Sequence, residues 1–156
     1  MKILLTGVTG YIGKRLLPVL LDEGHEVFCV VRDENRFDKQ EYASPLLHLI
    51  EADFLDYETL RHIPNEIDVA YYFIHSMSAS VGNFNKLEKT CAEHFRKRMD
   101  ETRVKQVIYL SGIVNEKKLS THLESRKSVE KILASGQYHM TTLRAGIIVG
   151  SGSSSF

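Results

Sequence analysis

The sequence predicts an α/β protein built on a doubly wound parallel sheet. Two observations lead to this fold class. Short segments that are apolar at nearly every position alternate along the chain with segments of helical periodicity. Continuous apolar runs are typical of strands buried on both faces, and helices between parallel strands form right-handed crossovers on both sides of a sheet. We therefore expect a Rossmann-like strand order of 3-2-1-4-5-6.

Six strands are expected, in residues 2–6, 26–31, 47–52, 68–74, 106–111 and 139–144. The first helix follows from an apolar stripe that repeats every three to four residues from Ile12 and ends at Gly24. Pro18 lies inside this stripe, and its missing backbone donor predicts a kink. A longer helix is expected over residues 83–101. A third helix is expected from the capping-box pattern Thr121-x-x-Glu124 to Gly136.

Composition narrows the classes of protein to consider. A chain of 156 residues can form one compact domain. Lys and Arg together number 20 and so do Asp and Glu, so the zero net charge gives no reason to expect nucleic acid or a membrane as partner. Cys29 and Cys91 lie in apolar patterns and are expected to be reduced core residues. The sequence shows no signal-peptide pattern, and together these features favour a cytoplasmic protein. The spacing of the histidines does not predict a metal site.

Three glycines mark the junction between the first strand and the first helix. Gly7, Gly10 and Gly13 fall three residues apart in TGVTGYIG. At such a junction glycine permits a tight turn, a close approach of backbone to phosphate, and close packing of helix on strand. The helix N-terminus adds free N–H groups and a partial positive charge. The pattern predicts a site for the pyrophosphate of a dinucleotide, and the alternative is a turn made for packing alone.

This loop resembles the TGxxGxxG loop of short-chain dehydrogenase/reductase (SDR) proteins, above all the atypical and extended branches with NmrA-like members and sugar-nucleotide epimerases. The segments GHEVFCVVR, ADFLD, VAYYFIHSMS, QVIYLSGI and TTLRAGIIVGSGS resemble later parts of the same fold. The resemblance implies an NAD(P)-binding Rossmann domain. The loop residues it assigns to the cofactor are Gly7, Thr9, Gly10, Tyr11, Ile12 and Gly13.

The end of the second strand indicates which dinucleotide is bound. NAD-binding relatives carry an acid there, whereas this chain has Val31 followed by Arg32. A guanidinium suits a 2′-phosphate, so NADP is favoured over NAD, although the neighbouring Asp33 would repel a phosphate unless it points away. The alternative is that Arg32 is a solvated charge. The resemblance also implies an adenine contact by Asp53 and Phe54, the alternative being that Asp53 caps the next helix.

The resemblance implies a catalytic Ser, Tyr and Lys, of which the chain keeps only the first. Ser111 matches the serine, but no YxxxK occurs, and HLESRKSVE carries His122 and Arg126 in that register. His122 could move a proton near neutral pH, or contact a ribose or solvent, whereas Arg126 stays protonated. Another offset would make Lys127 the functional cation. His75 is interpreted as a cofactor or substrate contact, or as a partly buried histidine.

Two functions are compatible with this pattern. One is an NAD(P)-dependent reductase or epimerase-like oxidoreductase with a small-molecule substrate. The other is a non-catalytic NAD(P)-binding redox sensor or assembly protein, which the replaced YxxxK favours. Family chains continue beyond the sixth strand, so we expect a cofactor domain in residues 1–150, a flexible tail at a truncation point in 151–156, and no substrate region. A homodimer is one assembly that the resemblance allows.

Overall fold

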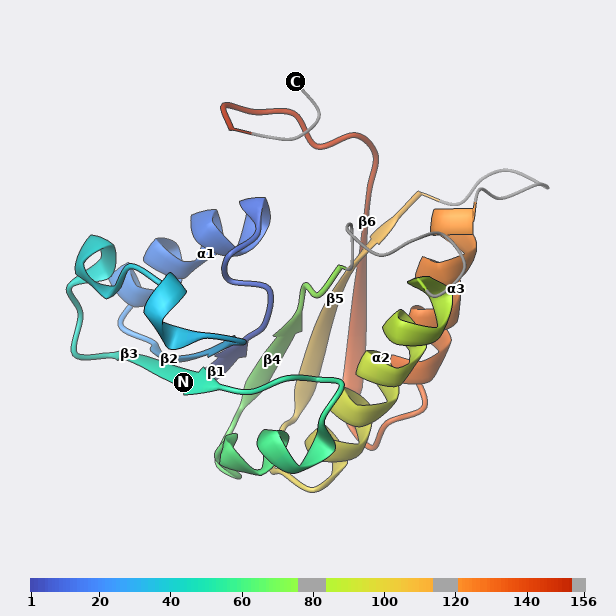
Figure 1. Cartoon of the computed structure of the whole chain (residues 1–156), viewed down its shortest axis with the longest axis horizontal. Helices are drawn as coiled ribbons and strands as arrows, with labels where there is room; N and C mark the ends of the chain where they lie inside the picture. The colour runs from blue at the N-terminus through green and yellow to red at the C-terminus, as the bar shows by residue number, and fades with distance from the viewer. Residues whose placement is uncertain (76–83, 114–120, 153–156) are drawn as a thin grey trace.

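A computed structural model describes residues 1–75, 84–113 and 121–152 and shows six parallel strands in one sheet of order β3-β2-β1-β4-β5-β6 (Figure 1). The expected fold class and strand order are confirmed. The strands are β1 (Lys2–Leu5), β2 (Glu26–Val31), β3 (Leu47–Glu51), β4 (Val69–Tyr72), β5 (Gln106–Gly112) and β6 (His139–Ala145). Each lies within a residue or two of its expected bounds.

Helices cover the two faces of the sheet unequally. One face carries α1 (Tyr11–Asp22), while α2 (Phe84–Asp100) and α3 (Thr121–Leu133) lie side by side on the other (Figure 1). Helix α1 continues through Pro18 without a break. On the α1 face Leu5, Leu17 and Cys29 form one core, and on the α2 face Tyr72 and Phe95 belong to a larger one.

Three short 3₁₀ segments were not expected from the sequence. They are η1 (Glu34–Arg36), η2 (Lys39–Tyr42) and η3 (Tyr57–His62). Each begins after an aspartate whose carboxylate accepts the N–H two residues later, namely Asp33, Asp38 and Asp56. Such local side-chain-to-backbone bonds stabilise single turns. The sequence feature that could have predicted these short helices is the aspartate that precedes each of them.

One face of β5 and β6 carries no described helix. In β5 the residues that face α2 and α3, Val107, Tyr109 and Ser111, are buried, whereas the alternate residues are only half-buried. On the neighbouring β6, Leu143 is 50% exposed. Figure 1 shows α1 lying over the β1–β3 half of the sheet, with no described helix over the same face of β5 and β6. No described helix is long and apolar enough to cross a membrane.

Candidate functional site

The glycine loop closes tightly between β1 and α1. Gly7 adopts a left-handed conformation with φ of 66°, and its carbonyl accepts the Gly10 N–H at 2.9 Å. A Cβ on Gly7 would overlap the Phe73 carbonyl beyond β4, and a Cβ on Gly13 would overlap the Gly7 carbonyl. Both glycines are therefore required by close backbone approach, which explains two of the three positions in the predicted loop.

The N-terminus of α1 is free to receive an anion. Its N-cap residue is Gly10, which provides no capping side chain, and the first turn contains no acidic residue. Thr9 and Gly10 are both exposed. The first N–H groups of a helix have no partners within it and carry a partial positive charge. This end of the helix suits a phosphate group.

Thr6 holds the loop in place, a role that sequence reasoning missed. Its buried hydroxyl donates to the Tyr71 carbonyl and accepts from the Phe73 N–H, both at 3.0 Å. These bonds join the end of β1 to the end of β4, beside the point where Gly7 meets Phe73. The only signal in the sequence was a hydroxyl residue placed between an apolar strand and a glycine.

The structure separates the roles of the two charges that follow β2. Arg32 is exposed. The Asp33 carboxylate instead accepts the Asn35 backbone N–H at 3.0 Å and the Asn35 side-chain amide at 3.2 Å, which caps η1. These two donors offset part of the repulsion that Asp33 would exert on an anion beside Arg32.

Asp53 follows β3 and does not cap a helix. One of its carboxylate oxygens accepts the Leu55 N–H at 2.9 Å, whereas Asp56 caps η3. Burial raises the pKa of the Cys91 thiol on α2 to about 11, and the Asp53 charge adds to this effect while Arg32 opposes it. Arg32 and Asp53 thus follow the paired carboxyl ends of β2 and β3, where the Val31 carbonyl accepts the Ala52 N–H at 2.9 Å.

Phe54 is mainly a core residue. Its ring is buried and lies 6.1 Å from that of Phe95, measured between centroids. Its carbonyl oxygen lies 2.8 Å from Nδ1 of His94, at hydrogen-bond distance. That carbonyl is therefore engaged within the protein, which leaves Asp53 as the more available polar group of this pair.

A cavity of about 410 Å³ lies at the carboxyl ends of β5 and β6. It brings together four residues singled out from the sequence: Ile12 of α1, His75 after β4, Ser111 of β5 and Arg126 of α3. The remaining lining residues are Leu110, Gly112, Ile113, Leu123, Ala145, Gly146, Ile147 and Ile148. The cavity is mostly apolar, with three polar side chains converging on it.

Ser111 presents a buried hydroxyl beside the Tyr109 hydroxyl, and no described residue lies in full hydrogen-bond geometry with it. The residue is 2% exposed. Tyr109 lies on the same face of β5, but its hydroxyl donates to the Arg126 carbonyl at 3.3 Å. Buried hydroxyls are nearly always hydrogen-bonded in folded proteins. The polar oxygen of a ligand in this cavity would meet that requirement.

His75 and Arg126 give the cavity one neutral and one charged polar group. Burial, followed by the charge of Arg126, lowers the pKa of His75 to about 4. The imidazole is therefore neutral at pH 7. Arg126 donates from Nη1 to the Leu110 carbonyl at 3.3 Å, and guanidinium groups stay protonated in proteins. The cavity can offer hydrogen bonds and a fixed positive charge to a ligand.

Lys127 and Glu130 of the HLESRKSVE segment do not line this cavity. His122 is in the first turn of α3, but its side chain is outside the described part of the structure. Lys127 is exposed and does not line the cavity, and Glu130 forms an ion pair with Arg144 at 2.7 Å. Arg126 is thus the cation of this segment that reaches the cavity. The described residues contain no group of three His, Cys, Asp or Glu side chains that could hold a metal ion.

A second, more open cavity of about 510 Å³ lies beside α2. Tyr57, His94 and Lys97 line it, and none of the residues selected from the sequence does. The Tyr57 hydroxyl donates to Glu101 at 2.6 Å, and the Lys97 ammonium lies 4.0 Å from the centre of the Tyr57 ring. Because none of the residues predicted from the sequence lines this cavity, we take the smaller cavity as the candidate site.

Comparison with known sequences supports a dinucleotide site. The sequence profile of a family described as NAD(P)H-binding matches residues 7–149. The auxiliary protein GraX of Staphylococcus aureus is 32% identical over 117 residues, which cover 71% of this chain and 36% of that protein. A bifunctional pinoresinol-lariciresinol reductase of Linum usitatissimum is 34% identical over 74 residues, or 44% of this chain and 24% of the enzyme. The matched stretch thus spans about a quarter to a third of these relatives.

Solved structures show the same fold at low sequence identity. A nucleoside-diphosphate-sugar epimerase of Staphylococcus aureus superposes with a TM-score of 0.76 at 14% identity, covering 92% of this chain and 50% of the other. The enzyme WbmH of Bordetella bronchiseptica, solved in complex with NAD⁺, has a TM-score of 0.75 at 15% identity and covers 92% and 55%. This chain corresponds in length to about half of each of these proteins.

Proposed function

The chain belongs to the NAD(P)H-binding family, in keeping with its resemblance to atypical SDR proteins, and from this premise we propose that it is the cofactor domain of an NADP-preferring oxidoreductase. The observation that carries the proposal is the glycine loop. Gly7 and Gly13 leave no room for a Cβ, and they lie at the uncapped N-terminus of α1. A loop built only for packing would not require an open helix end.

The residues that would hold the cofactor fall into three groups. The loop residues Thr9 and Gly10 and the first turn of α1 would bind the pyrophosphate through N–H groups. Arg32 would pair with the 2′-phosphate through its planar guanidinium, and Asp53 would contact the adenosine. The cavity that contains Ser111 would take the nicotinamide end. Bound NADPH would supply a hydride to an acceptor such as a carbonyl carbon.

The side chains around the cavity would orient and polarise the acceptor. The buried Ser111 hydroxyl would donate to its oxygen, and the neutral His75 imidazole offers a second donor. Arg126 would stabilise negative charge there but cannot pass a proton at neutral pH. His122 is the candidate proton donor, since it stands in the register of the family tyrosine.

A non-catalytic function is the second candidate. Arginine in place of the family lysine, and histidine in place of the tyrosine, remove the usual proton-transfer pair. Similarity to a protein named as auxiliary, GraX, favours a regulator or assembly protein that binds NADP without turnover. In that case Ser111 and His75 would serve to recognise the cofactor alone.

Oxidation of NADPH with a panel of small carbonyl compounds distinguishes the two functions. The oxidoreductase proposal expects turnover that falls at least about tenfold in Ser111→Ala, because one polarising hydrogen bond is lost. Lys127→Ala, on an exposed position of the same helix as Arg126, is the matched control. Tight NADPH binding without turnover of any compound would favour the regulator instead.

A further inference from the structure

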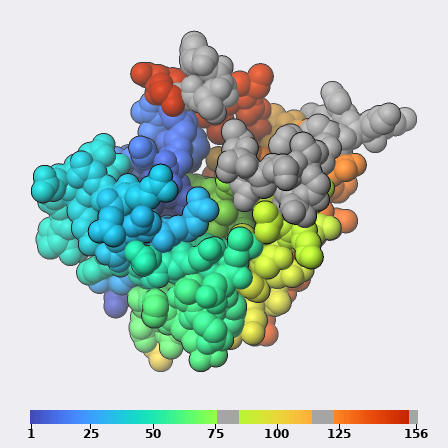
Figure 2. All heavy atoms as spheres, viewed as in Figure 1, coloured from blue at the N-terminus to red at the C-terminus, as the bar shows by residue number. Residues whose placement is uncertain are grey.

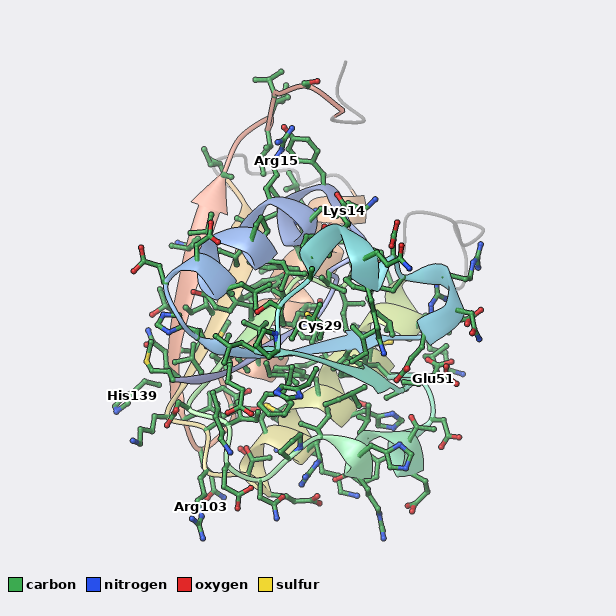
Figure 3. The ribbon with its side chains drawn as sticks, turned by 90° about the vertical axis from the view of Figure 1, so that its left-hand side faces the viewer. Lys14, Arg15, Cys29, Glu51, Arg103 and His139 are labelled. Atoms are coloured by element: carbon green, nitrogen blue, oxygen red, sulfur yellow. The ribbon has the colours of Figure 1, made fainter. Side chains whose placement is uncertain are left out.

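The chain that follows β6 is attached to the first helix by side chains of α1. Arg15 Nη2 donates to the carbonyl oxygen of Ser151, 136 positions later in the sequence. The guanidinium carbon of Arg15 also lies 4.4 Å from the centre of the Tyr11 ring. Figure 2 shows the segment that follows β6, in red, above the blue atoms of α1, and Figure 3 shows Arg15 below this segment.

Gly150 approaches the Tyr11 side chain so closely that a side chain at position 150 would require the Tyr11 ring to move. A Cβ on Gly150 would overlap the Tyr11 hydroxyl oxygen. Within residues 146–152, here named the 146–152 segment, the backbone at Gly150 and Ser151 therefore meets side chains of α1. Two neighbouring residues, Gly150 and Ser151, make these contacts with two residues one turn apart on α1.

The contacts with α1 add to those at the end of β6 and to the interactions of Ile148. The hydrogen-bond ladder between β5 and β6 reaches the bond from Ile113 N–H to the Ala145 carbonyl at 3.1 Å. Beyond it Ile147 is 82% exposed and Val149 is 63% exposed, so these apolar side chains add little burial energy. The contacts with Arg15 and Tyr11 are therefore polar and close attachments at the far end of the segment.

The same segment forms one wall of the candidate site. Gly146, Ile147 and Ile148 line the cavity of about 410 Å³ together with Ile12 and Ser111. A wall attached only at β6 would move away from Ile12 easily. The bond from Arg15 to Ser151, three residues after Ile148, would keep this wall close to Ile12.

We propose that Tyr11 and Arg15 are positioning residues that hold the 146–152 segment as a wall over the nicotinamide end of the cofactor site. The first turn of α1 then acts at both ends of the dinucleotide. Its backbone faces the pyrophosphate, and its side chains fix the wall beyond the nicotinamide. The ligand part of this inference rests on the proposed function, whereas the attachment of the segment does not.

Amide hydrogen exchange of Arg15→Ala tests the attachment without any ligand. Loss of one hydrogen bond and one ring contact is expected to speed exchange in residues 146–152 about five- to tenfold. Lys14→Ala is the matched control, since Lys14 is exposed on the same turn and its side chain has no hydrogen bond or ion pair within the described residues. Arg15→Lys should recover part of the protection, because an ammonium group can still donate to the Ser151 carbonyl.

Gly150→Ala and Tyr11→Phe test the close approach. The added methyl of Gly150→Ala should displace the segment and speed exchange as Arg15→Ala does. Combining it with Tyr11→Phe, which removes the obstructing hydroxyl oxygen, should restore most of the protection. A rescue of this kind is not expected from a variant that only destabilises the fold.

Stopped-flow dissociation of NADPH tests the ligand part. Arg15→Ala should release NADPH about five- to tenfold faster, while Lys14→Ala should match the wild type. Exchange rates in 146–152 that are equal in Arg15→Ala and Lys14→Ala would overturn the inference. If wild-type chain does not bind NADPH, the proposed function fails, and the exchange measurements still decide whether the segment is attached.

Discussion

Arg32 follows β2 as an exposed cation, while the carboxylate of Asp33 beside it is engaged in capping η1. This difference supports a role for Arg32 in binding the 2′-phosphate. We predict that Arg32→Ala weakens NADPH binding about 10- to 100-fold, the usual value of a charge-assisted pair, and leaves NADH binding within about threefold. Calorimetric titration with each nucleotide measures both effects.

Arg36→Ala provides the control for this prediction, because Arg36 is also exposed and lies one turn further along the chain. Its removal changes the net charge equally. A loss of NADPH affinity that is the same in Arg32→Ala and Arg36→Ala would assign the effect to general charge, and equal losses for NADPH and NADH would exclude a 2′-phosphate contact.

His75 makes stability depend on pH. Burial and the charge of Arg126 lower its pKa to about 4, whereas an unfolded histidine has a pKa of about 6.5. Below pH 6.5 the unfolded chain binds a proton that the folded chain does not, so stability falls as the pH decreases towards 4. We predict that wild type loses on the order of 2 kcal/mol more than His75→Gln between pH 7 and pH 5. Urea unfolding at the two pH values tests this, and identical losses would contradict the assignment.

Site residues could be predicted from the sequence when the contacts that require them lie within a few residues along the chain. Gly7 and Gly13 could be identified because their backbone requirements arise within a short loop. Thr6 and Arg15 could not, since their partners are Tyr71 and Ser151, far away in sequence. Tyr11 was assigned to the cofactor from the loop pattern, and the structure adds contacts of its ring that no local pattern contains.

At the scale of elements, the packing of α1 against the loop depends on Gly13. A Cβ there would overlap the Gly7 carbonyl, and backbone at this junction cannot move aside without shifting α1 from β1. We predict that Gly13→Ala lowers the free energy of unfolding by about 1–3 kcal/mol, the usual cost of overpacking. Gly146→Ala is the control, because the nearest atom to its Cβ would be Ile113 Cδ1 at 3.8 Å. Equal urea midpoints for the two variants would contradict this account.

The strands and long helices could be predicted because each repeats its pattern over several residues. The apolar run of β2 and the apolar stripe of α1 are long enough to distinguish the repeat of a buried strand from that of a helix. The segments η1, η2 and η3 have three to six residues, too few for periodicity to appear. Their capping aspartates were the usable signal. The predicted 83–101 helix begins at Phe84 in the structure, and its first predicted residue lies outside the described ranges.

For the whole molecule, the face of β5 and β6 that no described helix covers has consequences for association. Leu143 is 50% exposed there, and the nearby Ile113 is 48% exposed. Exposed apolar surface of this kind favours self-association. We predict that the chain associates with increasing concentration and that Leu143→Lys shifts it towards monomer, whereas Val19→Lys on α1 does not.

Sedimentation velocity over a range of concentrations measures this association. Val19 is a suitable control because it is 54% exposed but lies on the outer surface of a helix that is already packed. A wild-type chain that sediments as a clean monomer at every concentration would show that this face does not drive association.

The order of the strands could be predicted because it follows from the alternation of strands and helices along the whole chain. Right-handed crossovers and a glycine loop after the first strand leave few arrangements, and 3-2-1-4-5-6 is the one observed. The gathering of His75, Ser111 and Arg126 at one cavity follows from this order, since each lies on or next to β4, β5 or α3. Their exact contacts depend on side-chain packing that sequence patterns do not encode.

Calorimetric titration of the wild-type chain with NADPH and with NADH tests the central claim most directly. The account predicts one site per chain, with NADPH bound more tightly than NADH, because the glycine loop would serve both nucleotides and Arg32 only the first. Binding of neither nucleotide would contradict the claim that the glycine loop, the open end of α1 and the Ser111 cavity together form a cofactor site.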